Sequence, residues 1–366
     1  MRVSGKPTRW CRANWLGGSI IGVLLVVACS PSASAPATGQ GAPSTGGQAT
    51  QPSAAVKPAA SDSKIIVRLG HAQTLAHHQH LAAQKFADLV AQKTNGKAEV
   101  KIFPNGQLGG PREHIEAIRQ GGLEMTQFGA DVVEPILPVM GTLALPYLWD
   151  REKADRMLSG DLGKQMSEKL KAATGVSVIA WTDLGSVSMI TKSKTIKAPA
   201  DLKGLKMRVP EVPSVVKLFQ MWGANPTVVA FNEVYNALQT GVVDGAVTPP
   251  DGMVTQKWHE VSKQLSLTRH IFIPTNVLIS DKFLQAQPAD VKKGIEDAAH
   301  EAFEVFDRDL FTKVEGGAIQ TMKDSGVTVT EPDLEPFKKG VETIWKEFTD
   351  KVPDAGPIVK IIQETK

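Results

Sequence analysis

The residue best suited to ligand chemistry is Arg208, in the segment GLKMRVP at 204–210. Apolar residues alternate there with two basic residues and a proline ends the run, which is typical of a short strand with one face in the core. The planar fork of an arginine donates two parallel hydrogen bonds and therefore suits a carboxylate. Two interpretations follow: a solvated residue at a strand end, or the anchor of an anionic ligand.

Other candidate ligand contacts are expected at the ends of neighbouring strands. In open α/β sheets, ligands bind beyond the carboxyl ends of the strands. The segments EMTQF, VSVIAWTD and VVDGAVT are interpreted as such strands, and their last residues include Gln127, Phe128, Trp181, Thr182, Asp183 and Thr248. Arg208 is the only cation in this set, which indicates an acidic ligand, while Trp181 also suits the core.

Four histidines lie at a strand end and at the start of a helix: His71, His77, His78 and His80. Imidazoles at positions i and i+3 share a helix face, as a zinc or nickel site requires. No paired carboxylate stands at ligand spacing beside them, so we expect no metal and no other cofactor. A ligand contact by His71 or His77 remains open, as do surface or capping roles for all four.

Alternating strands and helices must position these side chains. The sequence predicts strands at 65–72, 98–104, 123–129, 176–183 and 204–210, and helices at 77–94 and 111–121. The alternation continues to about residue 250 and favours parallel strands with crossover helices. The helical stretch 289–323 would span about 50 Å, more than one small domain, so we expect it to bridge two.

The composition is that of an ordinary globular protein. The chain has 366 residues, 42% hydrophobic and 22% charged, enough for two domains with real cores. Four of the basic residues lie in the first 28 residues, which hold no acid, so the remainder is close to neutral. No basic patch remains to indicate nucleic acid. Cys11 and Cys29 are the only cysteines, which excludes a disulfide or cysteine-based metal site in the body of the chain.

The N-terminal segment predicts export. A positive stretch precedes the apolar run LGGSIIGVLLVVA, and residues 1–28 fit a secretory signal. The run ends in VVACS, which resembles the lipobox of bacterial lipoproteins and makes Cys29 the expected lipidation site. A plain signal peptide cut nearby and an uncleaved membrane anchor are the alternatives. Residues 29–63 would then form a lipidated cysteine and a disordered tether rich in Ser, Ala, Pro and Gly.

Several segments in order resemble the solute-binding proteins of TRAP transporters, the DctP type. They are TNGKAEVKIFPNGQLGG, LALPYLW, ADLKGLKMRVP, NPTVVAFNEVYNALQTGVVDG and KWHEVSKQLSLTRH, and the match runs from about Leu69 to the C-terminal region. The resemblance implies a two-lobed periplasmic-binding-protein-like α/β fold, with hinge segments and a long helix spanning both lobes. It also implies that the protein binds an organic acid outside the inner membrane and delivers it to a permease of one small and one large subunit.

The resemblance also implies site residues and lobe boundaries. It makes Arg208 the carboxylate anchor and Phe231 the aromatic residue that packs on the ligand. We expect residues 64–185 plus 272–313 in lobe I, and 186–271 plus 314–366 in lobe II. Residues of the same signature segment are expected to have structural roles. Asn232 is the expected cap of a helix, Glu233 lies in its first turn and Gly241 ends it, while Gly245 is expected in a tight turn. Tyr235 and Asp244 are also interpreted as mainly structural.

Departures from the family pattern bear on the ligand. Members that bind sialic or sugar acids carry a second arginine where this chain has Val187 or Ser188. Many family members have polar residues at two positions that are Val247 and Thr248 in this chain, and at a third that is Gly129. With Trp181, Met189, Phe128 and Phe231 as walls, we expect a less hydroxylated carboxylate, such as an aromatic or branched oxo acid.

Two other functions remain as alternatives. One is an exported lipoprotein enzyme such as a hydrolase, although the sequence has no G-x-S-x-G, H-E-x-x-H or Walker motif. The other is a binding protein that serves a membrane sensor. The segment 339–352 reads as a packed amphipathic helix or as a pairing surface, so a monomer and a dimer both remain open.

Overall fold

The structure, a computed structural model, describes residues 64–365. The predicted signal peptide, the lipidation of Cys29 and the tether at 29–63 lie outside the described residues. Within the described range, no helix is both long enough and apolar enough to cross a membrane.

A nine-stranded mixed sheet runs through the described residues, in the order β2-β1-β3-β8-β4-β7-β5-β6, with β9 beside β8. The strands are β1 (Ile65–His71), β2 (Ala98–Phe103), β3 (Met125–Gly129), β4 (Val176–Thr191), β5 (Lys206–Val209), β6 (Asn225–Val228), β7 (Gly245–Thr248), β8 (Gln264–Ser280) and β9 (Thr328–Thr330). The strands predicted from the sequence are all present, although β4 is longer than expected.

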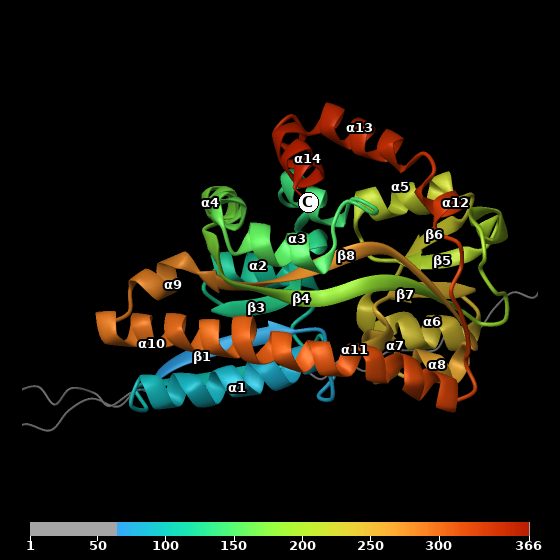
Figure 1. Ribbon diagram of the computed structural model, residues 1–366. Coiled ribbons are helices and arrows are strands. Elements are labelled where there is room, and N and C mark those ends of the chain that lie inside the picture. The colour runs from blue at the N-terminus through green and yellow to red at the C-terminus, as the bar shows by residue number, and fades with distance from the viewer. Residues whose placement is uncertain (1–63, 366) are drawn as a thin grey trace, which may run out of the picture. The chain divides into compact units, whose positions relative to one another are not determined.

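Two long strands, β4 and β8, form the middle of the sheet and lie side by side (Figure 1). They run antiparallel to each other, and they also pair antiparallel with β7 and β3 respectively. The prediction of parallel strands is confirmed for β1 with β2 and β3, and for β5 with β6 and β7, but it is wrong for β4 and β8. The predicted strand end at Asp183 is also wrong. The pairing with β8 continues from Val176 to Thr191 through three register shifts, which hide the simple alternation of a regular strand.

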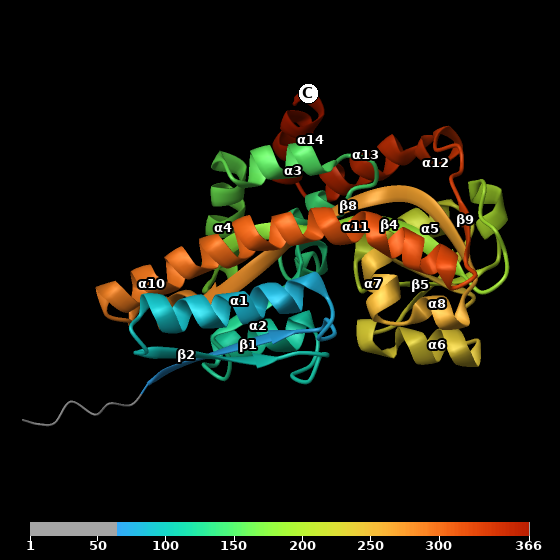
Figure 2. The same ribbon diagram turned by 60° about the horizontal axis from the view of Figure 1, so that its bottom comes forward.

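Helices cover both faces of the sheet (Figure 2). They are α1 (His78–Lys93), α2 (Pro111–Arg119), α3 (Arg151–Leu158), α4 (Asp161–Thr174), α5 (Pro213–Met221), α6 (Val234–Thr240), α7 (Pro250–Thr255), α8 (Trp258–Val261), α9 (Asp281–Gln285), α10 (Ala289–Ala299), α11 (Asp307–Asp324), α12 (Glu335–Lys338), α13 (Val341–Lys351) and α14 (Ala355–Glu364). The predicted helices at 77–94 and 111–121 are confirmed as α1 and α2. The segment 339–352 contains α13, whose Val341, Ile344 and Phe348 are buried.

One long helix crosses the molecule, because α10, a π-helical stretch at His300–Phe306 and α11 follow without a break. Its first half packs on α1 and its second half on α7 and β9 (Figures 1 and 2). The prediction that this segment bridges two parts of the fold is confirmed.

The two ends of the sheet have separate hydrophobic cores. We call the part around β1–β3, α1 and α2 lobe I, and the part around β5–β7 and α6–α8 lobe II. Phe86 and Phe303 lie in the core of lobe I, and Leu238 and Trp258 in that of lobe II. A third and larger cluster lies around β4, β8 and the C-terminal helices. Because the sheet is continuous, the boundaries expected at residues 185, 271 and 313 stay a prediction.

The segment from Phe231 to Gly245, which contains α6, differs in part from the expected structure. Gly241 ends α6 with φ 77°, as predicted. A 3-10 turn at Phe231–Glu233 precedes the helix, however, so Glu233 occupies the N-cap position and the predicted cap at Asn232 is wrong. Gly245 is not in a tight turn but begins β7, where an added Cβ would lie 2.7 Å from the carbonyl oxygen of Ile190. Asp244 has a structural role, since its carboxylate accepts the Lys206 N–H at 2.8 Å.

Candidate functional site

A cavity of about 640 Å³ lies where the carboxyl ends of β3, β5 and β7 meet. Its wall includes residues at or just after the ends of β1 and β3 in lobe I, and of β5, β6 and β7 in lobe II. This volume lies within the range of small-molecule sites, and contact with both lobes is the arrangement that closure around a ligand requires.

The structure brings most of the predicted contacts to this cavity. Those that line it are Arg208, Phe231, Gln127, Phe128 and Thr248. They come from β5, from the turn before α6, from the end of β3 and from the end of β7. The rule that ligands bind beyond strand ends therefore locates the cavity, while the ligand contacts themselves stay a prediction.

Arg208 is a buried cation, with 4% of its surface exposed, so the interpretation as a solvated strand-end residue is wrong. Its Nε donates to the carbonyl of Val229 at 2.9 Å, and its Nη1 to that of Val247 at 3.4 Å. Neither acceptor carries a full charge, and no ion pair joins Arg208 to another of residues 64–365. Burial lowers the pKa of Arg208 to about 10, against an opposing effect of Asp131.

The local sequence explains how Arg208 reaches the cavity. β5 pairs with β6 on one side and with β7 on the other, which satisfies its backbone on both edges. Met207 is fully buried, and side chains alternate along a strand, so Arg208 projects from the opposite face. The ring of Phe231 lies against the guanidinium, with 5.7 Å between the Arg208 Cζ and the ring centroid.

Two further buried polar side chains, Gln127 and Asp131, lie on the cavity wall. Gln127 is 1% exposed, and neither its Oε1 nor its Nε2 has a hydrogen-bond partner among the described residues. Burial raises the pKa of Asp131 to about 6, although backbone amides and Arg208 oppose that rise. Buried polar groups are normally hydrogen-bonded, so Gln127 is a candidate to bind ligand. Sequence reasoning missed Asp131, which lies two residues beyond the end of β3.

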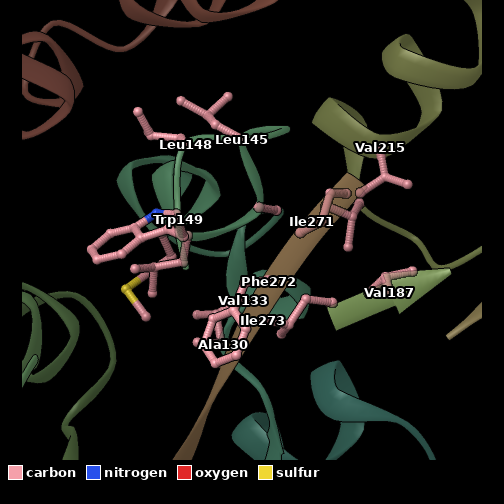
Figure 3. Packing of buried hydrophobic residues seen from close by; sticks show 14 of the residues in the cluster. Ala130, Val133, Leu145, Leu148, Trp149, Val187, Val215, Ile271, Phe272 and Ile273 are labelled. Carbon is pink, nitrogen blue, oxygen red and sulfur yellow. The ribbon is translucent and has the colours of Figure 1, made fainter. Parts of the chain in front are cut away.

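Apolar side chains form most of the remaining wall. Val187 of β4 and Ile271 and Ile273 of β8 line the cavity and also belong to the large core cluster (Figure 3). Val247 and Gly129 line it too, at positions where the family resemblance leads us to expect polar groups. These apolar side chains offer no hydrogen-bond partner to a ligand, whereas other lining residues carry polar groups: Gln73, Arg112, Glu113, Glu211, Asn232 and Glu233.

Three predicted contacts do not line the cavity, and the expectation for them is corrected here. Trp181 lies in the middle of β4 and faces a separate hollow of about 410 Å³ beside α4. Met189 is fully buried in the large core cluster. The Nε2 of His71 lies 3.1 Å from the Nδ1 of His80, and its own Nδ1 accepts the Gln73 N–H. The first two were misplaced because β4 does not end at residue 183.

The four histidines are all buried, so the surface role expected for them is wrong. A capping role holds for His77, whose Nδ1 accepts the Gln79 N–H at the start of α1. The side chains of His77 and His78 meet Asp251 of α7 and Asp307 of α11. No spacing within the sequence around the histidines could reveal these carboxylates, because they come from distant helices.

Comparison with known proteins identifies the family of the chain. Residues 69–351 match the family model described as bacterial extracellular solute-binding protein, family 7. The chain is 31% identical over 303 residues to the 2,3-diketo-L-gulonate-binding periplasmic protein YiaO of Escherichia coli (strain K12), covering 82% of this chain and 92% of that protein. It is 33% identical to the C4-dicarboxylate-binding periplasmic protein DctP of Rhodobacter capsulatus, covering 84% and 90%.

Among solved structures, the fold is similar to that of a TRAP periplasmic solute-binding protein from Roseobacter denitrificans with bound β-D-glucuronate. The TM-score is 0.79 at 32% sequence identity, and the match covers 82% of this chain and all of the other.

Proposed function

The chain belongs to family 7 of the bacterial extracellular solute-binding proteins, and we propose that its cavity binds the carboxylate of an organic acid through Arg208. Proteins of this family are receptors rather than enzymes. The protein accordingly works outside the cytoplasmic membrane, where it binds a small acid and delivers it to a TRAP-type secondary transporter.

The observation that carries this proposal is the buried and unpaired charge of Arg208. Taking a cation out of water is costly unless an anion compensates for it. The described residues supply two backbone carbonyls and the more distant influence of Asp131. A ligand carboxylate placed against the guanidinium would supply the missing charge and two acceptor oxygens.

The chemistry of the wall favours an acid with an apolar body. A buried hydroxyl group without a hydrogen-bond partner costs about 1–3 kcal/mol. Val187, Val247 and Ile273 provide no such partner, whereas Gln127 can hold one or two polar groups. We therefore propose an aliphatic, branched or aromatic oxo acid as the ligand class, in preference to the sugar acid bound by the Roseobacter relative.

Closure of the lobes would complete the binding cycle. The cavity is lined by Gln127 and Phe128 from lobe I and by Arg208 and Phe231 from lobe II. A ligand that touches both sets of residues binds the closed form more tightly and shifts the population towards it. The closed form would be the state that the membrane permease recognises.

A thermal-shift screen with matched neutral compounds tests this function. Branched and aromatic 2-oxo acids, simple monocarboxylates, dicarboxylates and uronates are compared, each beside its own amide. The reasoning predicts that an apolar oxo acid raises Tm in a concentration-dependent way, and that its amide does not. Equal shifts by an acid and its amide would contradict carboxylate recognition, and the largest shift with a uronate would contradict the proposed ligand class.

Membrane attachment through Cys29 belongs to the same proposal, on the strength of the VVACS segment. A lipid on this residue would hold the receptor near its permease at the outer face of the membrane. Mass spectrometry of the native protein should find a diacylglycerol-sized addition at Cys29, and Cys29→Ser should release the protein into the soluble fraction. An unmodified cysteine, or membrane attachment that persists in the variant, would refute the lipid anchor. We leave the monomer and the dimer as alternatives, which sedimentation would distinguish.

A further inference from the structure

A second group of polar side chains lies outside the carboxylate cavity, at the junction of the two lobes. His77 and His78 begin α1 in lobe I, and Asp251 lies in the first turn of α7 in lobe II. Asp251 is 5% exposed and the two histidines 1% and 2%. One ligand atom from each of the three residues lies within 4.8 Å of the other two. None of the three residues lines the carboxylate cavity.

These three atoms approach one another without forming hydrogen bonds. The Asp251 Oδ2 lies 3.2 Å from the His77 Nε2 and 3.4 Å from the His78 Nε2. All three atoms are nonetheless buried and without a hydrogen-bond partner among the described residues. Since the distances are short enough, the ring N–H directions must be unsuited to a hydrogen bond with the carboxylate oxygen.

The separations agree with the edges of a tetrahedral metal site. Two donors that each lie 2.0–2.1 Å from a zinc ion stand roughly 3.3 Å apart at the tetrahedral angle. The observed separations of 3.2 and 3.4 Å bracket that value. Two imidazoles and a carboxylate are also a ligand set that zinc and its neighbours in the periodic table accept.

A fourth residue, Asp307, contacts the His78 imidazole on the nitrogen that faces away from Asp251. The Asp307 Oδ1 lies 2.7 Å from the His78 Nδ1, and the Asp307 Oδ2 accepts a hydrogen bond from the Thr182 hydroxyl at 2.6 Å. A carboxylate on the far nitrogen holds the proton there and leaves Nε2 free to coordinate, as in carboxylate–histidine–zinc arrangements. A divalent ion would also balance the two buried carboxylates.

We propose that His77, His78 and Asp251 bind one divalent transition-metal ion of the zinc class, with Asp307 as the residue that orients His78. An ion bound there would join α1 to α7, which both pack against the long helix α11. The site would thus link lobe I to lobe II at a place separate from the carboxylate cavity.

The position of the proton on the His77 ring differs between the metal-bound form and a metal-free form. The Gln79 N–H donates to the His77 Nδ1 at 3.2 Å, which leaves the proton of a neutral ring on Nε2. Coordination through Nε2 moves this proton to Nδ1 and gives up the capping bond. The competing state of the cluster is a proton-bridged one, in which both histidines turn N–H groups towards Asp251 and no metal binds.

Cobalt titration of the full chain, stripped of metal with a chelator and free of any histidine tag, tests the proposal. We expect one Co²⁺ per chain at neutral pH, with the visible absorption of a tetrahedral complex, and displacement of Co²⁺ by Zn²⁺. The variants His78→Gln and Asp251→Asn should weaken binding by about 100-fold or more, and Asp307→Asn by roughly 10- to 100-fold. His80→Gln is the matched control, because His80 is a buried histidine of α1 that contacts His71 instead.

Crystals of the wild-type chain grown with Zn²⁺ give a readout that does not depend on how the variants fold. Anomalous diffraction at the zinc edge should show a peak between His77, His78 and Asp251. No cobalt binding by the wild-type chain, equal affinity in wild type and Asp251→Asn, or an anomalous peak elsewhere would each overturn the proposal in favour of the proton-bridged cluster.

Discussion

Replacement of Arg208 by methionine should move ligand affinity and the stability of the ligand-free protein in opposite directions. Methionine keeps an unbranched, flexible side chain, although a shorter one, and removes the charge and the five N–H donors. If Arg208 anchors a desolvated carboxylate, its loss should cost about 2–5 kcal/mol of binding free energy. That corresponds to an affinity roughly 30- to 4,000-fold lower.

The stability of the ligand-free protein follows from the pKa of Arg208. Burial lowers this pKa from the usual arginine range to about 10, and each unit is worth about 1.4 kcal/mol, so the charge destabilises the fold by about 3 kcal/mol. Because the folded pKa is the lower one, this penalty is complete below pH 10 and disappears only as the pH rises towards the pKa of arginine in the unfolded chain. Loss of the hydrogen bonds to Val229 and Val247 offsets about 2 kcal/mol of the gain. The free energy of unfolding at neutral pH should therefore rise by about 1 kcal/mol.

Calorimetry with the best acid from the screen measures the affinity, and urea unfolding of the ligand-free protein measures the stability. Lys206→Met is the matched control, since Lys206 is an exposed cation on the same strand. It should leave the unfolding free energy within about 0.5 kcal/mol of wild type. Unchanged affinity in Arg208→Met would refute the assigned anchor. A loss of stability above about 2 kcal/mol would refute the claim that the charge is unpaired in the ligand-free protein.

Three other perturbations test neighbouring parts of the account. Burial raises the pKa of Asp131 to about 6, so lowering the pH from 8 to 5 should neutralise this residue beside the ligand carboxylate and raise the ligand affinity by up to about tenfold. Calorimetry should show no such pH dependence in Asp131→Asn. The same pH dependence in this variant would count against Asp131 as the cause. Phe231→Leu removes the ring face beside the guanidinium and should weaken binding by about 1 kcal/mol, measured by the same titration, whereas unchanged affinity would place the ring outside the ligand contact. Gly245→Ala should lower the unfolding free energy by about 1–3 kcal/mol, because the added Cβ would lie 2.7 Å from a backbone oxygen. Gly317→Ala should raise it by up to about 1 kcal/mol, because this helix residue has no atom within 4 Å of an added Cβ. Equal effects of the two variants in urea unfolding would refute the packing argument.

The sequence predicted those parts of the site that depend on local pattern. The alternation around Arg208 and the strand ends at Phe128 and Thr248 are short-range features, and the structure places all three residues on one cavity. The long helix was also predictable, because its apolar spacing continues from 289 to 323 without a strong stop signal. The choice between a solvated and a buried Arg208 needed the tertiary structure.

Features that depend on distant pairing were not predictable in the same way. Trp181 was expected at a strand end, but β4 continues past it because β8 pairs with β4 along its whole length. The register shifts in that pairing break the alternation that would have marked a long strand. His78 could not be matched with Asp251 or Asp307, because only the packing of α1 with α11, and of α11 with α7, brings these side chains together.

A crystal structure of the protein with the acid selected by the screen would test the central claim most directly. We predict closed lobes, with both carboxylate oxygens of the ligand at about 2.7–2.9 Å from guanidinium nitrogens of Arg208 and the apolar body against Val187 and Ile273. A ligand whose carboxylate lies elsewhere, with the guanidinium still bonded only to backbone carbonyls, would contradict the account.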